Sequence, residues 1–363
     1  MAYTPIDNPQ EHFKPVGYVG NDTEPRNIDV GFQSDFTWVK DYTIAYYHRL
    51  FDSTRGNVGP LYPSEDNKQD HFNDGPEIDF SSPYSNGFKI IDNPDGTTNS
   101  YGVNANNSNI ISWNWKLNGG TTSTNTDGDI TSTVQANTDA GISIITYTGN
   151  GSTSQTVGHG LGAEPYVIMS KDVLSTSNVP GWRLYHKVVG NNKYMELQDD
   201  GGQSTFDDWG NTTPTSSVYT VGGSGGYRPT NTNATAYVAY CFTPKQGYSR
   251  FAFFRGNGST DGPFVYTGFK PAFVMFKQYT ANGNSWFMFD NVRSTVNGDM
   301  PFLRADGTNT QSGAGSDLFQ FFSNGFKLKH NDSAFNGNNH DYLYWAFAEN
   351  PFVTSGGAPT TAR

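Results

Sequence analysis

The chain has 363 residues, of which 34% are apolar, 15% aromatic and 16% charged, and its net charge is −11. Few charges and many aromatic residues exclude a disordered chain, and an acidic balance without runs of Lys or Arg argues against binding to duplex nucleic acid. Cys241 is the single cysteine, which excludes an intramolecular disulfide and suits folding in a reducing cytoplasm.

Residues 1–12 contain no basic region followed by an apolar run, so we expect an N-terminal arm and not a signal peptide. No apolar stretch approaches the roughly 18 residues that a transmembrane helix needs. The sequence therefore predicts no membrane insertion.

Three parts of the chain begin with the same elements in the same order. An aromatic residue followed by Gly-Asn opens each part, in YVGND, YTGNGS and FRGNGS. Next comes a strand that starts near a Gly and ends on Lys, in GFQSDFTWVK, GAEPYVIMSK and GFKPAFVMFK. A third element places Phe51, Tyr185 and Phe289 at corresponding positions. This order predicts one structural unit that is used three times.

The last strand of each repeat gives the clearest alignment, because IISWNWK, YVAYCFT and YLYWAFA match without gaps. Matched apolar columns lie two residues apart, which is the period of a strand with one buried face. We predict that the aromatic columns pack inward, with one pair in the core of each domain. The pairs are Trp113 with Trp115, Tyr240 with Phe242, and Trp345 with Phe347.

The motif SNGFK occurs in the first and third repeats, whereas residues 216–226 fill this position in the second. Asn-Gly favours a two-residue hairpin turn in which both residues take positive φ. We therefore predict turns at Asn86-Gly87 and Asn324-Gly325, with Phe88 and Phe326 at the start of the returning strands.

These patterns predict an all-β chain of three tandem antiparallel β-sandwich domains of about 105 residues each. Residues 117–141 are rich in Thr, Ser, Asn and Gly, which is typical of a flexible linker, but alternation from Ile130 to Ala136 leaves an edge strand open. The expected parts are an arm at 1–12, domains at 13–116, 142–247 and 248–352, and an arm at 353–363.

No catalytic or metal-binding pattern stands out. There is no G-x-S-x-G motif, the histidines are scattered, and the Asp-Gly loops at 125–130 and 304–309 are more typical of turns than of calcium sites. Cys241 is interpreted as a small buried residue. The sequence predicts no cofactor, no metal and no catalytic residue.

Two groups of residues remain as candidates for a site. Glycoside hydrolysis needs two carboxylates, which the acidic pairs Asp199-Asp200 and Asp207-Asp208 offer, although such pairs are typical of solvated loops. Aromatic rings can stack on sugars. Trp182 and Trp286 lie at matched strand starts, which favours the core, whereas Trp209 and Tyr227 lie in loops, where binding residues concentrate. Ligand-binding residues stay unassigned.

Several segments also resemble a known family. TYTGNGS, VGHGLGAEP, DGPFVYTGFKPAFVMFK, SNGFK and the ending YWAFAENPFVTSGGAPTTAR are similar to virion-associated, cyanophage-type proteins of tailed phages that infect marine bacteria. The similarity is strong over residues 142–363 and weaker over 1–116. It implies tail-fibre-like repeat domains with a lectin-like (concanavalin or jelly-roll) sandwich, in a virion protein assembled in the host cytoplasm.

We therefore expect a non-enzymatic structural protein of the virion, as a tail-fibre or receptor-binding component for host attachment. Capsid decoration, another accessory position on the virion, and a virion-borne glycan-degrading enzyme stay open as alternatives. The expected partners are other virion proteins and a host-surface glycan or receptor, without nucleic acid.

The three repeats allow two assemblies. They can form a pseudo-threefold ring within one chain, or three chains can stack corresponding domains. The second junction, PKQGYS, leaves little room for domains to circle an axis, and the arm at 353–363 suits a clasp between subunits. We expect a homotrimer with stacked domains and termini that touch a neighbouring chain.

Overall fold

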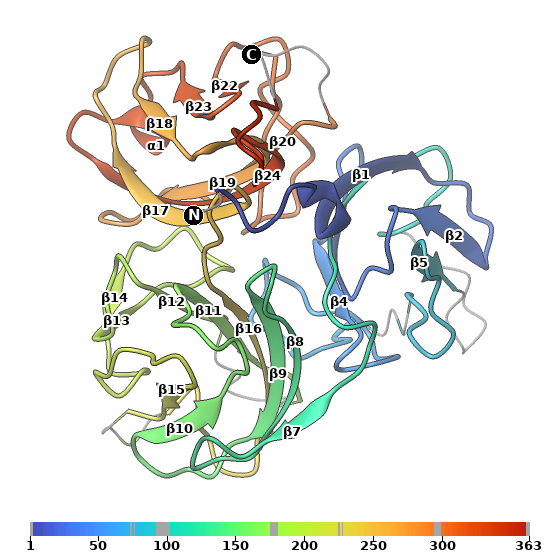
Figure 1. Cartoon of the computed structure of the whole chain (residues 1–363), viewed down its shortest axis with the longest axis vertical. Helices are drawn as coiled ribbons and strands as arrows, with labels where there is room; N and C mark the ends of the chain where they lie inside the picture. The colour runs from blue at the N-terminus through green and yellow to red at the C-terminus, as the bar shows by residue number, and fades with distance from the viewer. Residues whose placement is uncertain are drawn as a thin grey trace.

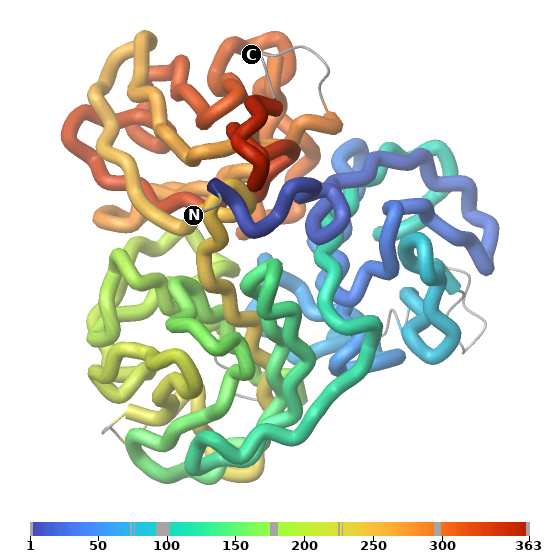
Figure 2. The backbone as a smooth tube through the Cα atoms, viewed as in Figure 1, coloured from blue at the N-terminus to red at the C-terminus, as the bar shows by residue number. Residues whose placement is uncertain are grey.

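The computed structural model describes residues 3–72, 75, 77–91, 102–174, 181–223, 226, 228–293 and 299–360. The chain is all-β with antiparallel sheets, as predicted, and helix in these ranges is limited to the short η1 (Pro9–Glu11) and α1 (Ser333–Asn336). Figures 1 and 2 show three lobes grouped around one centre, one from each sequence repeat. Lobe 1 holds strands β1–β6, lobe 2 holds β7–β16, and lobe 3 holds β17–β24.

Lobe 1, coloured blue to cyan in Figure 1, has a larger sheet in the order β1-β6-β3-β4 and a smaller pair, β2-β5. Its strands are β1 (Phe13–Val19), β2 (Arg26–Asp29), β3 (Phe36–Asp41), β4 (Arg49–Asp52), β5 (Gly87–Ile90) and β6 (Asn109–Trp115).

Lobe 2 has a larger sheet in the order β12-β11-β16-β9-β8-β7 and the pairs β10-β15 and β13-β14. Its strands are β7 (Ser123–Asn125), β8 (Ser132–Asn137), β9 (Ile142–Thr148), β10 (Gln155–Gly158), β11 (Val167–Asp172), β12 (Arg183–His186), β13 (Lys193–Tyr194), β14 (Ser204–Thr205), β15 (Val218–Val221) and β16 (Ala236–Phe242). Strands β7 and β8 come from segment 117–141, so part of this segment is edge strand and not flexible linker.

Lobe 3 has a larger sheet in the order β17-β24-β19-β20-β21 and a smaller sheet, β18-β23-β22. Its strands are β17 (Ser249–Arg255), β18 (Phe264–Tyr266), β19 (Phe269–Gln278), β20 (Phe287–Asp290), β21 (Leu303–Arg304), β22 (Phe319–Phe322), β23 (Gly325–Leu328) and β24 (Asp341–Pro351).

The last strand of each repeat is buried on both of its faces. In β24, Leu343, Trp345 and Phe347 face a core that all three lobes share, whereas Tyr344 and Ala346 face the core between the two sheets of lobe 3. Strands β6 and β16 divide their side chains in the same way. The alternation in the sequence was therefore correct, but the assumption of one buried face was wrong because the lobes cover each other.

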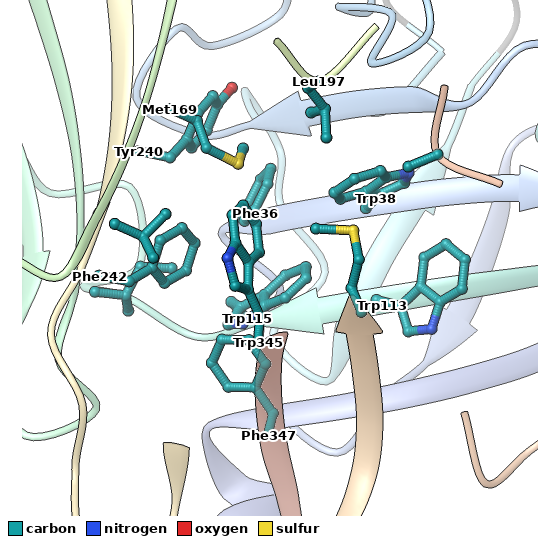
Figure 3. Close-up of a cluster of buried hydrophobic side chains, with 14 of the residues drawn as sticks. Phe36, Trp38, Trp113, Trp115, Met169, Leu197, Tyr240, Phe242, Trp345 and Phe347 are labelled. Atoms are coloured by element: carbon teal, nitrogen blue, oxygen red, sulfur yellow. The ribbon is translucent and has the colours of Figure 1, made fainter. Parts of the chain in front are cut away.

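The prediction of a separate aromatic pair in each domain core is wrong, because the six residues join one cluster (Figure 3). Ring contacts connect every pair of lobes. Phe36 of lobe 1 stacks on Tyr240 of lobe 2 with centroids 4.6 Å apart, Phe13 of lobe 1 lies 4.8 Å from Phe347 of lobe 3, and Phe242 of lobe 2 lies 6.2 Å from Trp345 of lobe 3. The centre of the molecule is an aromatic core built by the whole chain.

The expectation that the second junction is too short for a ring within one chain is also wrong. Strand β16 ends at the shared core with Phe242, and β17 begins beside it after a tight turn in which Tyr248 donates its main-chain N–H to the Lys245 carbonyl. Both strand ends lie near the centre, so the chain needs only this turn to pass from lobe 2 to lobe 3.

The turns lie one residue earlier than predicted, and in the described residues only the turn in lobe 3 joins two paired strands as a hairpin. Phe322 pairs with Gly325, so Ser323 and Asn324 form the turn, and β23 begins at the glycine. In the described residues neither the Asn nor the Gly of the two SNGFK motifs has positive φ. The glycines serve close packing instead, because a β-carbon at Gly87 would lie 1.8 Å from the Ile28 carbonyl oxygen and one at Gly325 would lie 2.2 Å from that of Val265.

The Gly-Asn motifs that open the repeats also have a structural role. In lobe 2, a β-carbon at Gly149 would lie 2.2 Å from the Thr232 carbonyl oxygen. Asn150 donates its main-chain N–H to the side chain of the buried Asn231, whose amide donates back to the Asn150 side chain. Asn257 and Asn336 repeat both bonds in lobe 3. The motif therefore ties the start of each repeat to the loop before its last strand.

Polar side chains at one repeated position bridge the lobes in a cycle. The position precedes the β4, β12 or β20 strand and holds His48, Trp182 or Trp286, each fully buried. Each ring nitrogen lies at hydrogen-bond distance from a main-chain carbonyl of another lobe. The contacts are Trp182 with Tyr62 (2.9 Å), Trp286 with Glu196 (3.0 Å) and His48 with Arg304 (3.0 Å).

The lysine that ends the second repeated element makes a parallel set of contacts. Lys40, Lys171 and Lys277 are at most 1% exposed. Their ammonium groups donate to carbonyls of another lobe, Lys40 to Thr308 (3.1 Å), Lys171 to Asp66 (2.9 Å) and Lys277 to Asp199 (2.8 Å). Burial is the main cause that lowers their pKa values, to about 7 for Lys40 and about 8 for Lys171 and Lys277.

The buried Lys277 predicts a pH dependence of stability. Its pKa falls from 10.5 to about 8 on folding, so between these values the unfolded chain binds more protons and stability rises with pH. Lys277→Met lacks this contribution. We expect the wild-type protein to gain stability relative to Lys277→Met as the pH rises from about 8 to about 10.5, measured by urea unfolding of both proteins. If the free energy of unfolding changed equally with pH in both proteins, the lowered pKa of Lys277 would be contradicted.

The described parts of both terminal arms fold against their own chain. Thr4 donates its hydroxyl to the Gln246 carbonyl at the junction between lobes 2 and 3. Ser355 of the C-terminal arm donates its main-chain N–H to the Asp7 carboxylate at 2.6 Å. The arms therefore close onto each other within one chain, and their predicted contact with a neighbouring chain stays a prediction.

Candidate functional site

Most of the aromatic candidates are part of the fold. Trp182 and Trp286 lie in the shared core, as the sequence favoured. Trp209 lies in a loop, as predicted, but it is 1% exposed and packs in lobe 2 against Tyr185, so the expected exposure of this ring is wrong. Tyr227 lies outside the described residues. Cys241 is a buried residue of the same lobe core, which agrees with its interpretation as a small core residue.

The acidic pairs do not behave as four solvated loop charges. Asp200 is exposed, and Asp199 and Asp207 are half-buried, but Asp208 is fully buried. Asp208 faces the Arg183 guanidinium, with Nε and Oδ2 3.5 Å apart. The loop at Asp199 also docks on lobe 3, because its carbonyl accepts the Lys277 bond. The interpretation of these pairs as solvated charge is therefore wrong for Asp208.

Arg183 is the centre of a cluster of charged groups in lobe 2. Its guanidinium contacts Glu196 as well as Asp208 and lies 4.1 Å from the centroid of the Tyr194 ring. Burial raises the pKa of Glu196 and of Asp208 to about 7 each, while the charge of Arg183 opposes the rise. A hydrogen bond with Asp199 raises the pKa of Glu196 further. The cluster therefore holds two carboxyl groups that titrate near neutral pH.

The same position in the other lobes indicates what this cluster does for the fold. Arg49 of lobe 1 forms a buried ion pair with Glu77 at 2.9 Å. Lobe 3 has Phe287 at this position, stacked on Phe335 with centroids 4.2 Å apart. An arginine-carboxylate pair and an aromatic pair thus fill the same site between the sheets, which is the behaviour of a packing position.

The protonation of Asp208 predicts a second pH dependence. Its pKa is 3.8 in the unfolded chain and about 7 when folded, so stability is lost as the pH rises through this range. Asp208→Asn removes the titrating group and should become more stable relative to wild type as the pH rises from about 4 to about 7. Chemical unfolding across this range checks the shift, and equal pH slopes for both proteins would refute it.

The loops considered for calcium contain ordinary loop contacts. Asp127 accepts a hydrogen bond from Asn125, and Asp306 accepts the main-chain N–H of Trp286. Within the ranges that the structure describes, there is no group of three or more His, Cys, Asp and Glu residues placed to hold a metal ion. Over the same ranges, no helix is long and apolar enough to cross a membrane.

A groove of about 450 Å³ lies on the surface of lobe 3. One wall is the start of β17, residues 249–252, and another is formed by residues 266–268. Tyr3 donates its hydroxyl to the Gly268 carbonyl at 3.0 Å and lies 3.1 Å from the Tyr266 hydroxyl. Tyr166 adds an aromatic ring from lobe 2. The groove combines aromatic rings, the exposed Arg250 and main-chain atoms of a strand, which is a suitable lining for a polar chain molecule.

No sequence motif predicts this groove. Its residues come from the N-terminal arm, the loop before β11, the second junction and two strands of lobe 3, so no motif joins them. Tyr266 and Phe264 are exposed aromatic residues in the short strand β18, where alternation with the buried Val265 is visible once the strand is known.

A single protein-family model spans all three lobes. The model of a domain of unknown function, DUF7483, matches residues 8–351. The chain belongs to the DUF7483 family. No curated protein and no solved structure matches it.

The DUF7483 match begins in the N-terminal segment, just before η1, and ends with β24. It therefore covers all three lobes as one unit, and not a single repeat. This extent agrees with the shared aromatic core, because a DUF7483 domain cut at a repeat boundary would expose the faces that the lobes bury against each other.

Proposed function

We propose that this DUF7483 protein is a non-enzymatic structural component of a tailed-phage virion, acting as a tail-fibre or receptor-binding part in host attachment. The observation that carries the proposal is the use of the repeated residues. The Gly-Asn motifs, the buried lysines and the buried His and Trp side chains all tie the lobes together. A chain whose repeated residues hold its three lobes in one fixed arrangement is suited to be a rigid component of a virus particle.

The expected place of action is the virion surface after folding in the host cytoplasm. Capsid decoration is the alternative position. Gold-labelled antibody against the protein, applied to intact particles of a phage that encodes it, distinguishes the two. Label at the fibre tips supports attachment, label on the head supports decoration, and particles without label would contradict a virion role.

Attachment makes a further prediction that does not depend on the position of the label. Purified protein should bind host cells and should compete with phage adsorption when added in excess. Cells of a resistant strain that lacks the receptor provide the matched control. Equal binding to both strains would contradict a receptor-binding role while leaving a structural role intact.

A virion-borne enzyme that degrades glycans is the second candidate, and the Arg183 cluster is the observation that favours it. A glycosidase needs one protonated and one ionised carboxyl group, and the pKa values of Glu196 and Asp208 near 7 allow both forms. Incubation with host-envelope polysaccharide tests this candidate. Release of sugar that Glu196→Gln abolishes would support the enzyme and overturn the non-enzymatic proposal.

The homotrimer stays a proposal for the assembled state. The pseudo-threefold arrangement already closes within one chain, so a trimer has to be built from outer surfaces and from the arms. Sedimentation of the intact chain and of a chain that lacks residues 353–363 tests it. Two monomers would contradict both the trimer and the role of the arm as a clasp.

A further inference from the structure

The first strand of each repeat occupies the same place in its sheet. Strands β1, β9 and β17 pair with the last strand of their lobe in the same register, which places Phe13, Ile142 and Ser249 opposite the corresponding aromatic residues Trp115, Phe242 and Phe347. In each case the outer side of the strand faces away from the rest of the sheet. The outer side of this strand differs among the three lobes.

Lobe 2 covers its edge with an added strand. β8 pairs with β9, so that Thr133 lies opposite Thr146 and Gln135 lies opposite Ile144. β8 belongs to the segment between the repeats, and not to the repeated unit. The repeated sheet therefore accepts an additional extended segment at this edge.

Lobe 1 has a proline at the same edge. The Gly20 N–H donates to the Ser108 carbonyl, which continues the β1–β6 ladder. The main-chain N–H and C=O groups of the even-numbered residues of β1 therefore point toward β6, and the nitrogen of Pro15 points outward. Proline has no N–H to donate to a further strand and is tolerated at an edge for that reason. The edge of β1 is therefore blocked to strand addition.

Lobe 3 leaves its edge open in the described part of the chain. β17 is the terminal strand of its sheet. The Gly256 N–H donates to the His340 carbonyl, which continues the β17–β24 ladder. The main-chain N–H and C=O groups of the even-numbered residues of β17 therefore point toward β24, and those of Phe251 and Phe253 point outward. They correspond to those of Ile144 and Thr146, which β8 covers in lobe 2.

The surroundings of this edge suit a ligand. The groove of about 450 Å³ lies along residues 249–252. Phe253 is 51% exposed, although it belongs to a strand whose other odd-numbered neighbour, Phe251, is buried. Arg255 is paired with Asp341 through two bonds, of 2.7 and 2.9 Å. Arg250 is exposed in the groove wall, and its partner, the Tyr344 hydroxyl, is neutral, so its charge can still meet an opposite charge on a ligand.

We propose that the open edge of β17 binds an extended segment of a partner polypeptide, which adds as an antiparallel strand and places an acidic residue opposite Arg250. Strand addition of this kind draws its affinity from main-chain hydrogen bonds and its specificity from alternate side chains. The register of β8 on β9 gives the arrangement. Ala136 lies opposite Ser143, the residue that corresponds to Arg250, so the ligand residue at that position faces the guanidinium.

The chain itself provides the probe. A fluorescent peptide with the sequence of residues 129–139 and the change Ala136→Glu should bind the full-length protein, measured by anisotropy. The same peptide with Ala136→Lys is its matched control. We expect the Glu peptide to bind roughly threefold more tightly than the Lys peptide, the size of one exposed ion pair.

Phe253→Pro and Phe253→Ala distinguish pairing at the strand edge from nonspecific hydrophobic binding of the peptide. Phe253→Pro removes the outward N–H, at a place where the matched strand of lobe 1 tolerates a proline two residues earlier, and should weaken binding about tenfold or more. Phe253→Ala removes the exposed ring but keeps the N–H, and should retain binding. Arg250→Glu should reverse the preference, so that the Lys peptide binds better, and this swap tests the proposal even if Phe253→Pro fails to fold.

Three results would overturn the proposal. They are the absence of binding by either peptide, equal binding by wild type and a folded Phe253→Pro, and the same peptide preference in wild type and Arg250→Glu. A wild-type dimer that Phe253→Pro abolishes would show that a second copy of the chain occupies the edge, and would exclude the acidic segment as its occupant. None of these results bears on where the protein sits on a virion.

Discussion

Trp345→Ala should lower the free energy of unfolding of the whole chain by about 3–5 kcal/mol, the usual cost of removing a large buried aromatic side chain. Trp345 is 3% exposed. Its ring centroid lies 5.9 Å from that of Trp286 in its own lobe and 6.2 Å from that of Phe242 in lobe 2. Because the cavity would open in the shared core, all three lobes should lose stability together. Urea unfolding followed by circular dichroism and by tryptophan fluorescence measures the change.

Phe253→Ala is the matched control for this substitution. Phe253 is also an aromatic residue of lobe 3, but it is 51% exposed, so its removal should change stability by no more than about 0.5 kcal/mol. We expect one unfolding transition with the same midpoint for both probes. A Trp345→Ala chain in which lobe 3 melts first, while the other signals keep the wild-type midpoint, would contradict a shared core.

Asp52→Ala should be nearly as damaging, at about 3–5 kcal/mol, because it leaves a charged group buried without its partner. The Asp52 carboxylate pairs with Arg55 at 2.5 Å, with side-chain exposures of 0% and 5%, and accepts the hydroxyl of Tyr240 from lobe 2 at 2.7 Å. The arginine also donates to the Leu50 carbonyl. The substitution therefore disrupts the fold of lobe 1 and its contact with lobe 2.

Arg255→Ala is the control for the charge itself. Arg255 binds Asp341 with good geometry, but its side chain is 60% exposed, and exposed pairs contribute about 0–1 kcal/mol. Thermal unfolding of the two variants should therefore differ widely. Similar losses for Asp52→Ala and Arg255→Ala would show that burial and the contact between lobes do not matter at Asp52.

The all-β fold and its repeated order of strands could be predicted because they depend on local patterns. The alternation in IISWNWK, YVAYCFT and YLYWAFA specifies which side chains share a face of the strand. It does not specify what covers that face. Whether Trp113 packs inside its own repeat or against another lobe depends on contacts between residues far apart in the chain. One such contact joins Trp113 to Phe273, with ring centroids 5.6 Å apart.

The lysine at the end of the second repeated element shows the same limit. The alignment found Lys40, Lys171 and Lys277 at one position, but lysine at a strand end is usually solvated. Their burial follows from the ring of lobes, which brings a carbonyl of another lobe to each ammonium group. A repeated charged residue within an apolar strand was the available sign of a buried contact.

The candidate sites were the least predictable part. Asp208 looked like a loop charge because it follows another aspartate, and its burial depends on Arg183 of β12. The groove on lobe 3 needed the N-terminal arm, lobe 2 and β17 to be placed together. The open edge of β17 becomes visible only when three equivalent strands are compared, since Pro15 and β8 show what its edge lacks.

The shared core is tested most directly by producing residues 245–363, which contain lobe 3, as a separate chain. Alone, this fragment would expose Phe251, Phe273, Trp345 and Phe347 on one face of its larger sheet. We expect this fragment to show poorly dispersed amide signals in a proton–nitrogen correlation spectrum and no cooperative unfolding transition. A well-dispersed spectrum together with a sharp transition would show that lobe 3 is an independent domain, and would contradict a core that the three lobes build together.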